Sequence, residues 1–157
     1  MIAQAIMYLS IVKLKCHKDD QRAYRVLAKK TIRLMSKHLK QNICGLAAQH
    51  APIANMDSIK LEEHLNSEVQ LSCKFWVQYL TWAGALLAND TEMHHTVYSF
   101  LQAHFLHWLE ALSLMKAISE GTQAITSLER LIEVCKHGLI PFLTVHQILY
   151  PFFRVIH

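Results

Sequence analysis

The chain has 157 residues, 52% of them hydrophobic and 18% charged, with a formal net charge of +4. This composition excludes a disordered chain and supplies enough apolar side chains for a sizeable core, in one domain or in a piece of a larger protein. Four glycines and three prolines are too few for the many turns of a strand-rich fold. We therefore predict an all-α protein, an irregular bundle of about five or six helices.

The first 19 residues form an apolar segment that we expect to be helical. Its start, MIAQAIMYLSIV, lacks the basic region of a secretory signal and is too short to cross a bilayer. The four cysteines of the chain are widely separated and form no CxxC pair; they are Cys16, Cys44, Cys73 and Cys135. We expect reduced thiols in a cytoplasmic protein.

Much of the positive charge lies between residues 13 and 40. The basic residues there are Lys13, Lys15, Lys18, Arg22, Arg25, Lys29, Lys30, Arg33, Lys37 and Lys40. Such a segment could bind phosphates, but Tyr24 is the only tyrosine, tryptophan or phenylalanine within it that could stack on a base. We expect a solvated helix face and no binding of nucleic acid.

Asp19 and Asp20 are predicted to begin a helix that continues to Ile43, where Gly45 would provide a left-handed C-cap. Helical spacing places a mostly apolar set of residues on one side of this helix. The set consists of Tyr24, Leu27, Ala28, Thr31, Leu34, Met35, His38 and Leu39.

Residues 46–57 are predicted to be a loop, after which Asp57 caps a short helix of sequence SIKLEEHL. Ser67 and Gln70 have the spacing of a capping box, so Ser67 is predicted to cap the next helix, residues 68–87. One side of that helix is expected to face the core. The residues on that side are Val69, Cys73, Trp76, Val77, Leu80 and Gly84.

Asn89 and Asp90 are predicted to end this helix and to cap a long one over residues 91–115. Ser119 is predicted to cap a further helix over residues 120–137. The final apolar segment, residues 138–156, is long enough to span a bilayer but contains Pro141, His146, Gln147 and Pro151. We expect a buried or partner-binding helix there in preference to a membrane span.

The stretch FLQAHFLHWLEALSLM, residues 100–115, contains two histidines and a glutamate in an apolar context. His104 and His107 share a helix face and could bind one metal ion. Glu110 lies about 120° from the face of His104, and His94 and His95 are too far along the helix to reach the same ion. Zinc needs further ligands, so we expect packing, with these polar side chains bonded to neighbouring helices or water. The apolar surface of this helix is predicted from Phe100, Leu101, Phe105, Leu106, Leu109, Leu112 and Met115.

Other candidate sites are weaker. Cys16–His17 and Cys135–His137 could be halves of a metal site, but only composition supports this, and Cys73 is expected to be a core thiol. The chain contains no GxSxG nucleophile elbow and no GxxxxGK[ST] phosphate-binding loop. We expect no catalytic, cofactor-binding or metal-binding residues and therefore no enzyme. The three tryptophans, Trp76, Trp82 and Trp108, are expected to be packing anchors.

Three segments occur in one order with natural spacings: IRLMSKHLKQNICGL, EVQLSCKFWVQYL and FLQAHFLHWLEALSLMKAISEG. Together they resemble fungal NACHT-type signalling ATPases, NLR-like proteins that often end in WD or ankyrin repeats. The resemblance covers roughly residues 20–132. It implies the end of a winged-helix portion and then a helical linker between the ATPase core and the sensor repeats. It also implies that the histidine-containing stretch is structural.

The resemblance implies a P-loop before residue 1 and sensor repeats after residue 132, and both are missing from the chain. The ends, residues 1–19 and 133–157, match no pattern, so we expect a truncated or remnant family member. We predict a non-enzymatic interaction or linker module whose exposed apolar helix faces bind a protein partner or a second copy. The alternatives are a membrane-associated protein using residues 138–156 and, less favoured, a histidine-based metal protein.

Overall fold

The computed structural model describes residues 18–43, 58–87 and 89–135. These residues form five α-helices and a short 3-10 helix, with no strand among them, which confirms the all-α prediction. The elements are α2 (Lys18–His38), α3 (Ser58–His64), α4 (Ser67–Ala83), η3 (Gly84–Leu87), α5 (Thr91–Leu114) and α6 (Ile118–Cys135). The predictions for the first 17 residues, for the loop at 46–57 and for the final apolar segment lie outside the described residues.

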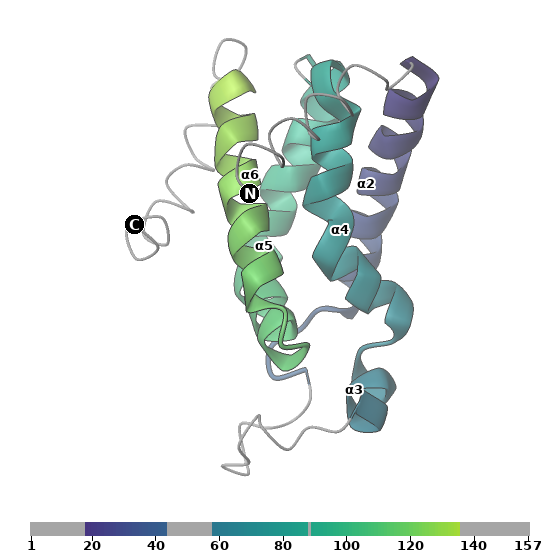
Figure 1. Ribbon diagram of the computed structural model, residues 1–157, viewed down its shortest axis with the longest axis vertical. Coiled ribbons are helices and arrows are strands. Elements are labelled where there is room, and N and C mark those ends of the chain that lie inside the picture. Colours follow the sequence, from purple (N-terminus) through teal and green to yellow (C-terminus); the bar gives the residue numbers. More distant parts are fainter. Residues whose placement is uncertain (1–17, 44–57, 88, 136–157) are drawn as a thin grey trace, which may run out of the picture.

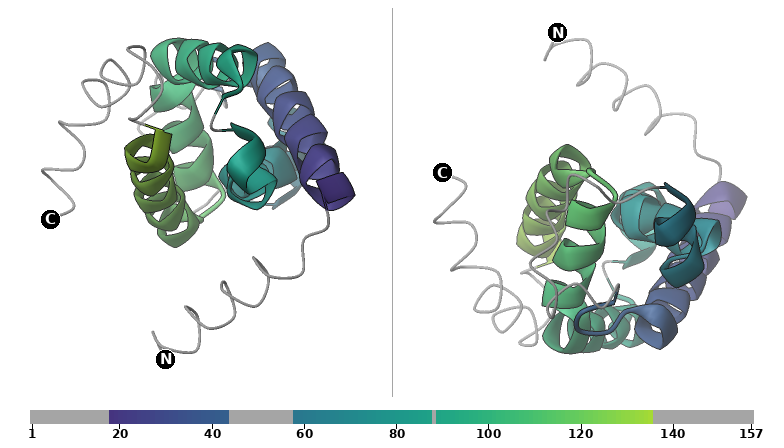
Figure 2. Two further views of the ribbon diagram at one scale, coloured as in Figure 1. Left: turned by 90° about the horizontal axis from the view of Figure 1, so that it is seen from above. Right: turned by 90° about the horizontal axis from the view of Figure 1, so that it is seen from below.

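The four long helices stand side by side, and successive ones run in opposite directions (Figure 1). As a result α2 and α5 run in the same direction, and the short α3 lies at one end. Seen from above, α4 lies between α2 and α6 (Figure 2). Because α4 packs against α2, α5 and α6, it is the central helix of the bundle.

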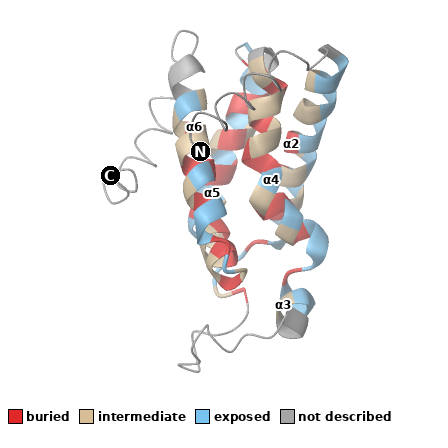
Figure 3. Cartoon of the chain, in the orientation of Figure 1, coloured by how far each residue is buried: buried red, intermediate tan, exposed pale blue. Residues whose placement is uncertain are grey.

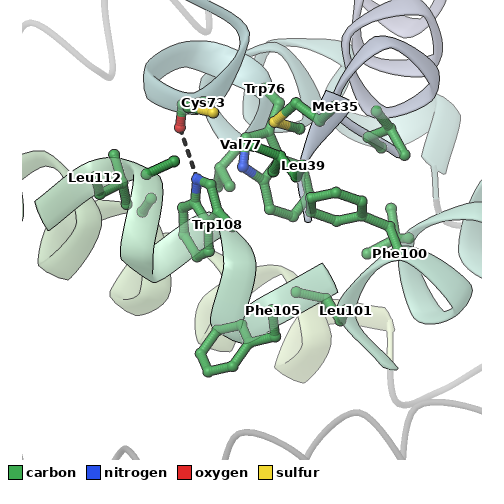
Figure 4. Packing of buried hydrophobic residues seen from close by; sticks show 14 of the residues in the cluster. Met35, Leu39, Cys73, Trp76, Val77, Phe100, Leu101, Phe105, Trp108 and Leu112 are labelled. Carbon is green, nitrogen blue, oxygen red and sulfur yellow. Dashed lines mark hydrogen bonds between the residues drawn. The ribbon is translucent and has the colours of Figure 1, made fainter. Parts of the chain in front are cut away.

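The core is built from the inward stripes of these helices, which appear red in Figure 3. Trp76 of α4 lies at its centre and is fully buried, as is Trp108 of α5. The ring of Trp76 meets those of Phe100 and Trp108 edge to face, with centroids 5.2 and 5.5 Å apart. The indole nitrogen of Trp108 donates a 2.8 Å hydrogen bond to the backbone carbonyl of Cys73, which joins α5 to α4 (Figure 4). These two tryptophans are packing anchors, as predicted.

Two of the predicted inward stripes need correction. In α2 the buried residues are Ala28, Ile32 and Met35, whereas Leu27 is 39% exposed and His38 is also exposed. In α5, Leu106 is 65% exposed. Each helix is covered only where a neighbour packs on it, so the apolar stripe of the sequence is wider than the face that is buried.

Several helix ends also differ from the prediction. α2 ends at His38, five residues early, and Asn42 adopts a positive φ of 53°, while Gly45 lies outside the described residues. α4 ends at Ala83, because Gly84 adopts a φ of 56° and its N–H bonds the carbonyl of Leu80. The chain then forms η3 instead of continuing the helix to residue 87.

The starts of α4 and α6 are each displaced from the predicted cap. Asn66, not Ser67, caps α4, since its side chain accepts the N–H of Val69 at 3.0 Å. α6 begins at Ile118, so Ser119 is already helical, and its hydroxyl bonds the carboxylate of Glu120. Asp90 caps α5 as predicted, through the N–H of Met93.

Close packing between α5 and α6 depends on a glycine in α6. A Cβ atom at Gly121 would lie 2.8 Å from the Cδ1 of Leu112, which is itself buried. The missing side chain lets the two helices approach each other. None of the helices in the described part of the chain is long and apolar enough to cross a membrane.

Candidate functional site

The histidine-containing stretch lies in the second half of α5, beside the end of α2. The side chains of His104 and His107 are half-buried, and their Nδ1 atoms are 3.4 Å apart. The ring of His104 stacks on that of Phe100, with a centroid distance of 5.8 Å. Burial lowers the pKa of His104, and the neighbouring His107 lowers it further, while the nearby backbone of Leu39 opposes both effects. The structure therefore brings the two histidines together and favours a neutral His104 ring.

Glu110 lies apart from this pair, as its angular offset predicts. Its carboxylate accepts two backbone hydrogen bonds, from the N–H of Asn42 at 3.1 Å and from the N–H of Ile43 at 3.2 Å. Both amides belong to the turn that follows α2, where Asn42 has a positive φ. Glu110 thus holds the end of α2 against α5 and has a structural role.

The other two histidines of α5 lie near its first turns, far from His104. His94 is buried in the core, whereas His95 is exposed, with its Nδ1 3.4 Å from the hydroxyl of Ser99. No group of three or more metal-ligating side chains occurs within residues 18–43, 58–87 and 89–135. The cysteine and histidine pairs at 16–17 and 135–137 lie wholly or partly outside the described side chains.

Cys73 is the free cysteine of the described core. It is 1% exposed, and burial raises the pKa of its thiol to about 12. A thiol with that pKa stays protonated at neutral pH and is a poor nucleophile. The position is that of a core thiol, as expected from the sequence.

Part of the basic segment is used inside the fold. Arg25 pairs with Asp90 and Glu92, and Lys29 pairs with Glu92, so α2 is joined to the start of α5. Burial alone would raise the pKa of Asp90, but hydrogen bonds from Arg25 and from the N–H of Met93 lower it overall. The sequence predicts Asp90 as a cap but does not predict its pairing with Arg25, because nothing in the local pattern indicates a partner 65 residues away.

Other basic side chains of α2 face solvent, including Lys30, Arg33 and Lys37. This matches the solvated helix face that the sequence predicts.

A stripe of four side chains runs along α4, with two exposed apolar residues and two half-buried residues, one of them the polar Gln78. We call Leu71, Phe75, Gln78 and Trp82 the α4 stripe, since positions i, i+4, i+7 and i+11 share a helix face. Leu71 is 55% exposed and Phe75 is 42% exposed. Trp82, at one end of the stripe, also belongs to an aromatic cluster. The other members are Tyr79 of α4 and Tyr24 of α2, and the ring centroids are 4.8 to 6.3 Å apart. This surface was not recognised from the sequence, although the spacing of its residues was readable there.

This chain is an all-α helical protein over its described residues. It is similar to the vegetative incompatibility protein HET-E-1 of Podospora anserina, with 32% identity over 113 residues. The match covers 66% of this chain but only 8% of the length of HET-E-1. It supports a distant link to the fungal NLR-like proteins that the sequence motifs resemble. No protein-family model and no solved structure matches the chain.

Proposed function

We propose that this chain is a non-catalytic helical interaction or linker module, related to the region that follows the nucleotide-binding core in fungal NLR-like signalling proteins. The observation that supports this most directly is its similarity to HET-E-1 over 113 residues. Because those residues are 8% of HET-E-1, the corresponding unit there is a small part of a long protein. A unit of this kind acts by packing against neighbouring structure.

The α4 stripe is the surface that we assign to this packing. The bundle already has a closed core, yet Leu71 and Phe75 remain exposed on its central helix. Removing apolar surface from water is favourable by about 25 cal/mol per Å², of which association retains only the part left after its entropic cost. The adjoining cluster of Tyr24, Tyr79 and Trp82 would extend the contact with aromatic side chains, which are enriched at protein interfaces. We propose that a second copy or a helical protein partner binds here.

Light scattering after size-exclusion chromatography, together with far-UV circular dichroism, tests this proposal. We expect the full chain to be helical and to form a defined oligomer, and the double variant Leu71→Asp, Phe75→Asp to stay helical but to lose at least half of that mass. Leu106→Asp is the matched control, since Leu106 is an exposed leucine on α5 outside the stripe. An equal mass for all three proteins would contradict self-association through α4. A circular dichroism spectrum without helical signal would contradict the proposal that the chain folds as a helical module.

A further inference from the structure

The side of α2 that faces away from the core carries four exposed cations, Arg22, Lys30, Arg33 and Lys37, which we call the α2 basic face. At about 100° per residue, these four positions lie within roughly 80° of arc, on the side away from the buried stripe of the helix. They extend over about 22 Å along the helix axis. In both end views α2 lies at an edge of the bundle (Figure 2). The α2 basic face is therefore an outer surface of the protein.

The charge of this face is not balanced by nearby carboxylates. Two other cations of α2, Arg25 and Lys29, point toward α5 and pair with acidic side chains there. In the part of the chain that the structure describes, the only ion pair of the α2 basic face is a 3.8 Å contact between the exposed side chains of Arg22 and Asp19. Residues 21–43 contain no aspartate or glutamate. Like charges three and four positions apart on a helix repel one another, so helix stability does not favour this arrangement, and an anionic partner would relieve the repulsion.

Apolar side chains accompany these cations and indicate the kind of anionic partner. Val26 is 47% exposed and lies between Arg22 and Lys30 on the same face, and Leu27 beside it is 39% exposed. At an anionic bilayer, Lys and Arg side chains lie near the lipid headgroups, while neighbouring apolar side chains enter the boundary of the acyl chains. The outer side of a single helix can present all of these residues to a flat surface at once.

A nucleic acid fits the same surface less well. Single strands are bound through aromatic side chains that stack on the bases. Tyr24 is the one tyrosine, tryptophan or phenylalanine of α2, and its ring is packed against those of Tyr79 and Trp82. Contacts to phosphates alone would give Val26 and Leu27 no role.

We propose that the α2 basic face binds the surface of an anionic membrane, with its four cations at the lipid headgroups and Val26 in the interfacial layer. The folded chain would lie on the bilayer through one edge of the bundle. This inference does not depend on the proposed interaction through the α4 stripe, because it uses side chains of a different helix.

Flotation of the full chain with two kinds of unilamellar vesicle tests the proposal. One kind contains phosphatidylcholine alone, and the other contains about 30% phosphatidylserine, which gives its surface a negative potential. We expect binding to the second kind only, and weaker binding at about 0.5 M salt than at about 0.1 M, because salt screens exposed charges. Equal binding to both kinds, or binding to neither, would overturn the proposal, and this comparison needs no variant.

The double variant Lys30→Gln, Arg33→Gln locates the contact on the protein. We expect its affinity for the anionic vesicles to fall by about tenfold or more, since each cation near such a surface contributes to binding. The matched control is Lys116→Gln, Arg130→Gln, which removes the same charge from exposed positions outside α2 and should bind like the wild type. Circular dichroism checks that both variants stay helical. Equal losses for the two double variants would show that net charge governs binding and would overturn the assignment to α2.

The variant Val26→Gln distinguishes a lipid surface from other polyanions. It should weaken binding to the anionic vesicles by roughly threefold or more, because an apolar side chain no longer leaves water on binding. Binding to duplex DNA should be weaker than binding to the vesicles and unchanged by this variant. If DNA binds at least as tightly as the vesicles, and Val26→Gln alters neither affinity, the assignment to a membrane is wrong.

Discussion

Glu110 illustrates how one side chain can be misjudged when it is considered beside its sequence neighbours. In the sequence it follows two histidines at intervals of three and invites comparison with a ligand set. In the structure it binds two backbone amides of the turn after α2. Nothing in the local sequence indicates that Glu110 bonds to Asn42 and Ile43, which precede it by 68 and 67 positions. Only its angular offset from His104 indicated that it would point elsewhere.

The variant Glu110→Ala should destabilise the protein by roughly 1–3 kcal/mol, because buried donors that lose their partner are costly. The substitution removes the acceptor of the N–H groups of Asn42 and Ile43 in a partly buried turn. Chemical denaturation followed by circular dichroism measures the change in the free energy of unfolding. Glu110→Gln, which keeps one acceptor oxygen, should lose less.

Glu63→Ala is the control for this prediction, since Glu63 lies on the exposed side of α3. We expect it to change the free energy of unfolding by no more than about 0.5 kcal/mol. Equal losses for Glu110→Ala and Glu63→Ala would show that the two amide bonds do not stabilise the end of α2.

At the scale of helices, the existence and order of the elements could be predicted, whereas their limits could not. The patterns of α4, α5 and α6 are long and periodic, and the structure has a helix at each position. The ends depend on competition between neighbouring polar residues. Ser67 has good capping chemistry, but Asn66 precedes it and takes the role, while Glu62 accepts the N–H of Ser67 at 2.7 Å. Gln70 also bonds Glu62 instead of closing a capping box.

The variants Asn66→Ala and Ser67→Ala distinguish a helix capped by Asn66 from one capped by Ser67 at the start of α4. The structure predicts that Asn66→Ala destabilises the protein by about 1 kcal/mol, the usual cost of removing an N-cap. Ser67→Ala should have little effect, because the Glu62 bond uses the backbone N–H of residue 67, which alanine retains. Thermal or urea unfolding of the two variants measures the difference. A larger loss of stability for Ser67→Ala than for Asn66→Ala would contradict the Asn66 cap and support the capping box that the sequence predicts.

The histidine pair could be found from sequence and the α4 stripe could not. His104 and His107 share a face by their spacing alone, although their 3.4 Å separation required the structure. For α4, the spacing of Leu71 and Phe75 does not show which apolar residues a neighbouring helix covers. That depends on where α2 and α6 pack, a property of the whole bundle.

At the scale of the molecule, α2 and α5 are parallel neighbours that are linked near both ends. Arg25 and Lys29 pair with the start of α5, and Glu110 near its other end binds the turn after α2. These links join segments more than 60 residues apart in the chain. Their loss should therefore affect the stability of the whole bundle more than the helicity of either segment.

The Arg25–Asp90 pair makes this stability dependent on pH. Burial alone would raise the pKa of Asp90, but hydrogen bonds from Arg25 and Met93 lower it overall in the folded protein. The pair therefore stabilises the fold above the unfolded-state pKa of about 3.9 and ceases to do so as the pH falls through the lower folded value.

The variant Asp90→Asn isolates this effect, because asparagine is an equally good N-cap for α5. The Arg25 side chain is 32% exposed, so solvent screening should limit the loss at neutral pH to roughly 1 kcal/mol. Unfolding curves of both proteins from neutral to acid pH should differ by this amount at first and converge below about pH 4. A difference in the free energy of unfolding that stays constant across the whole pH range would show that the introduced asparagine disturbs packing or the cap. No difference at neutral pH would show that the Arg25–Asp90 pair contributes nothing to stability.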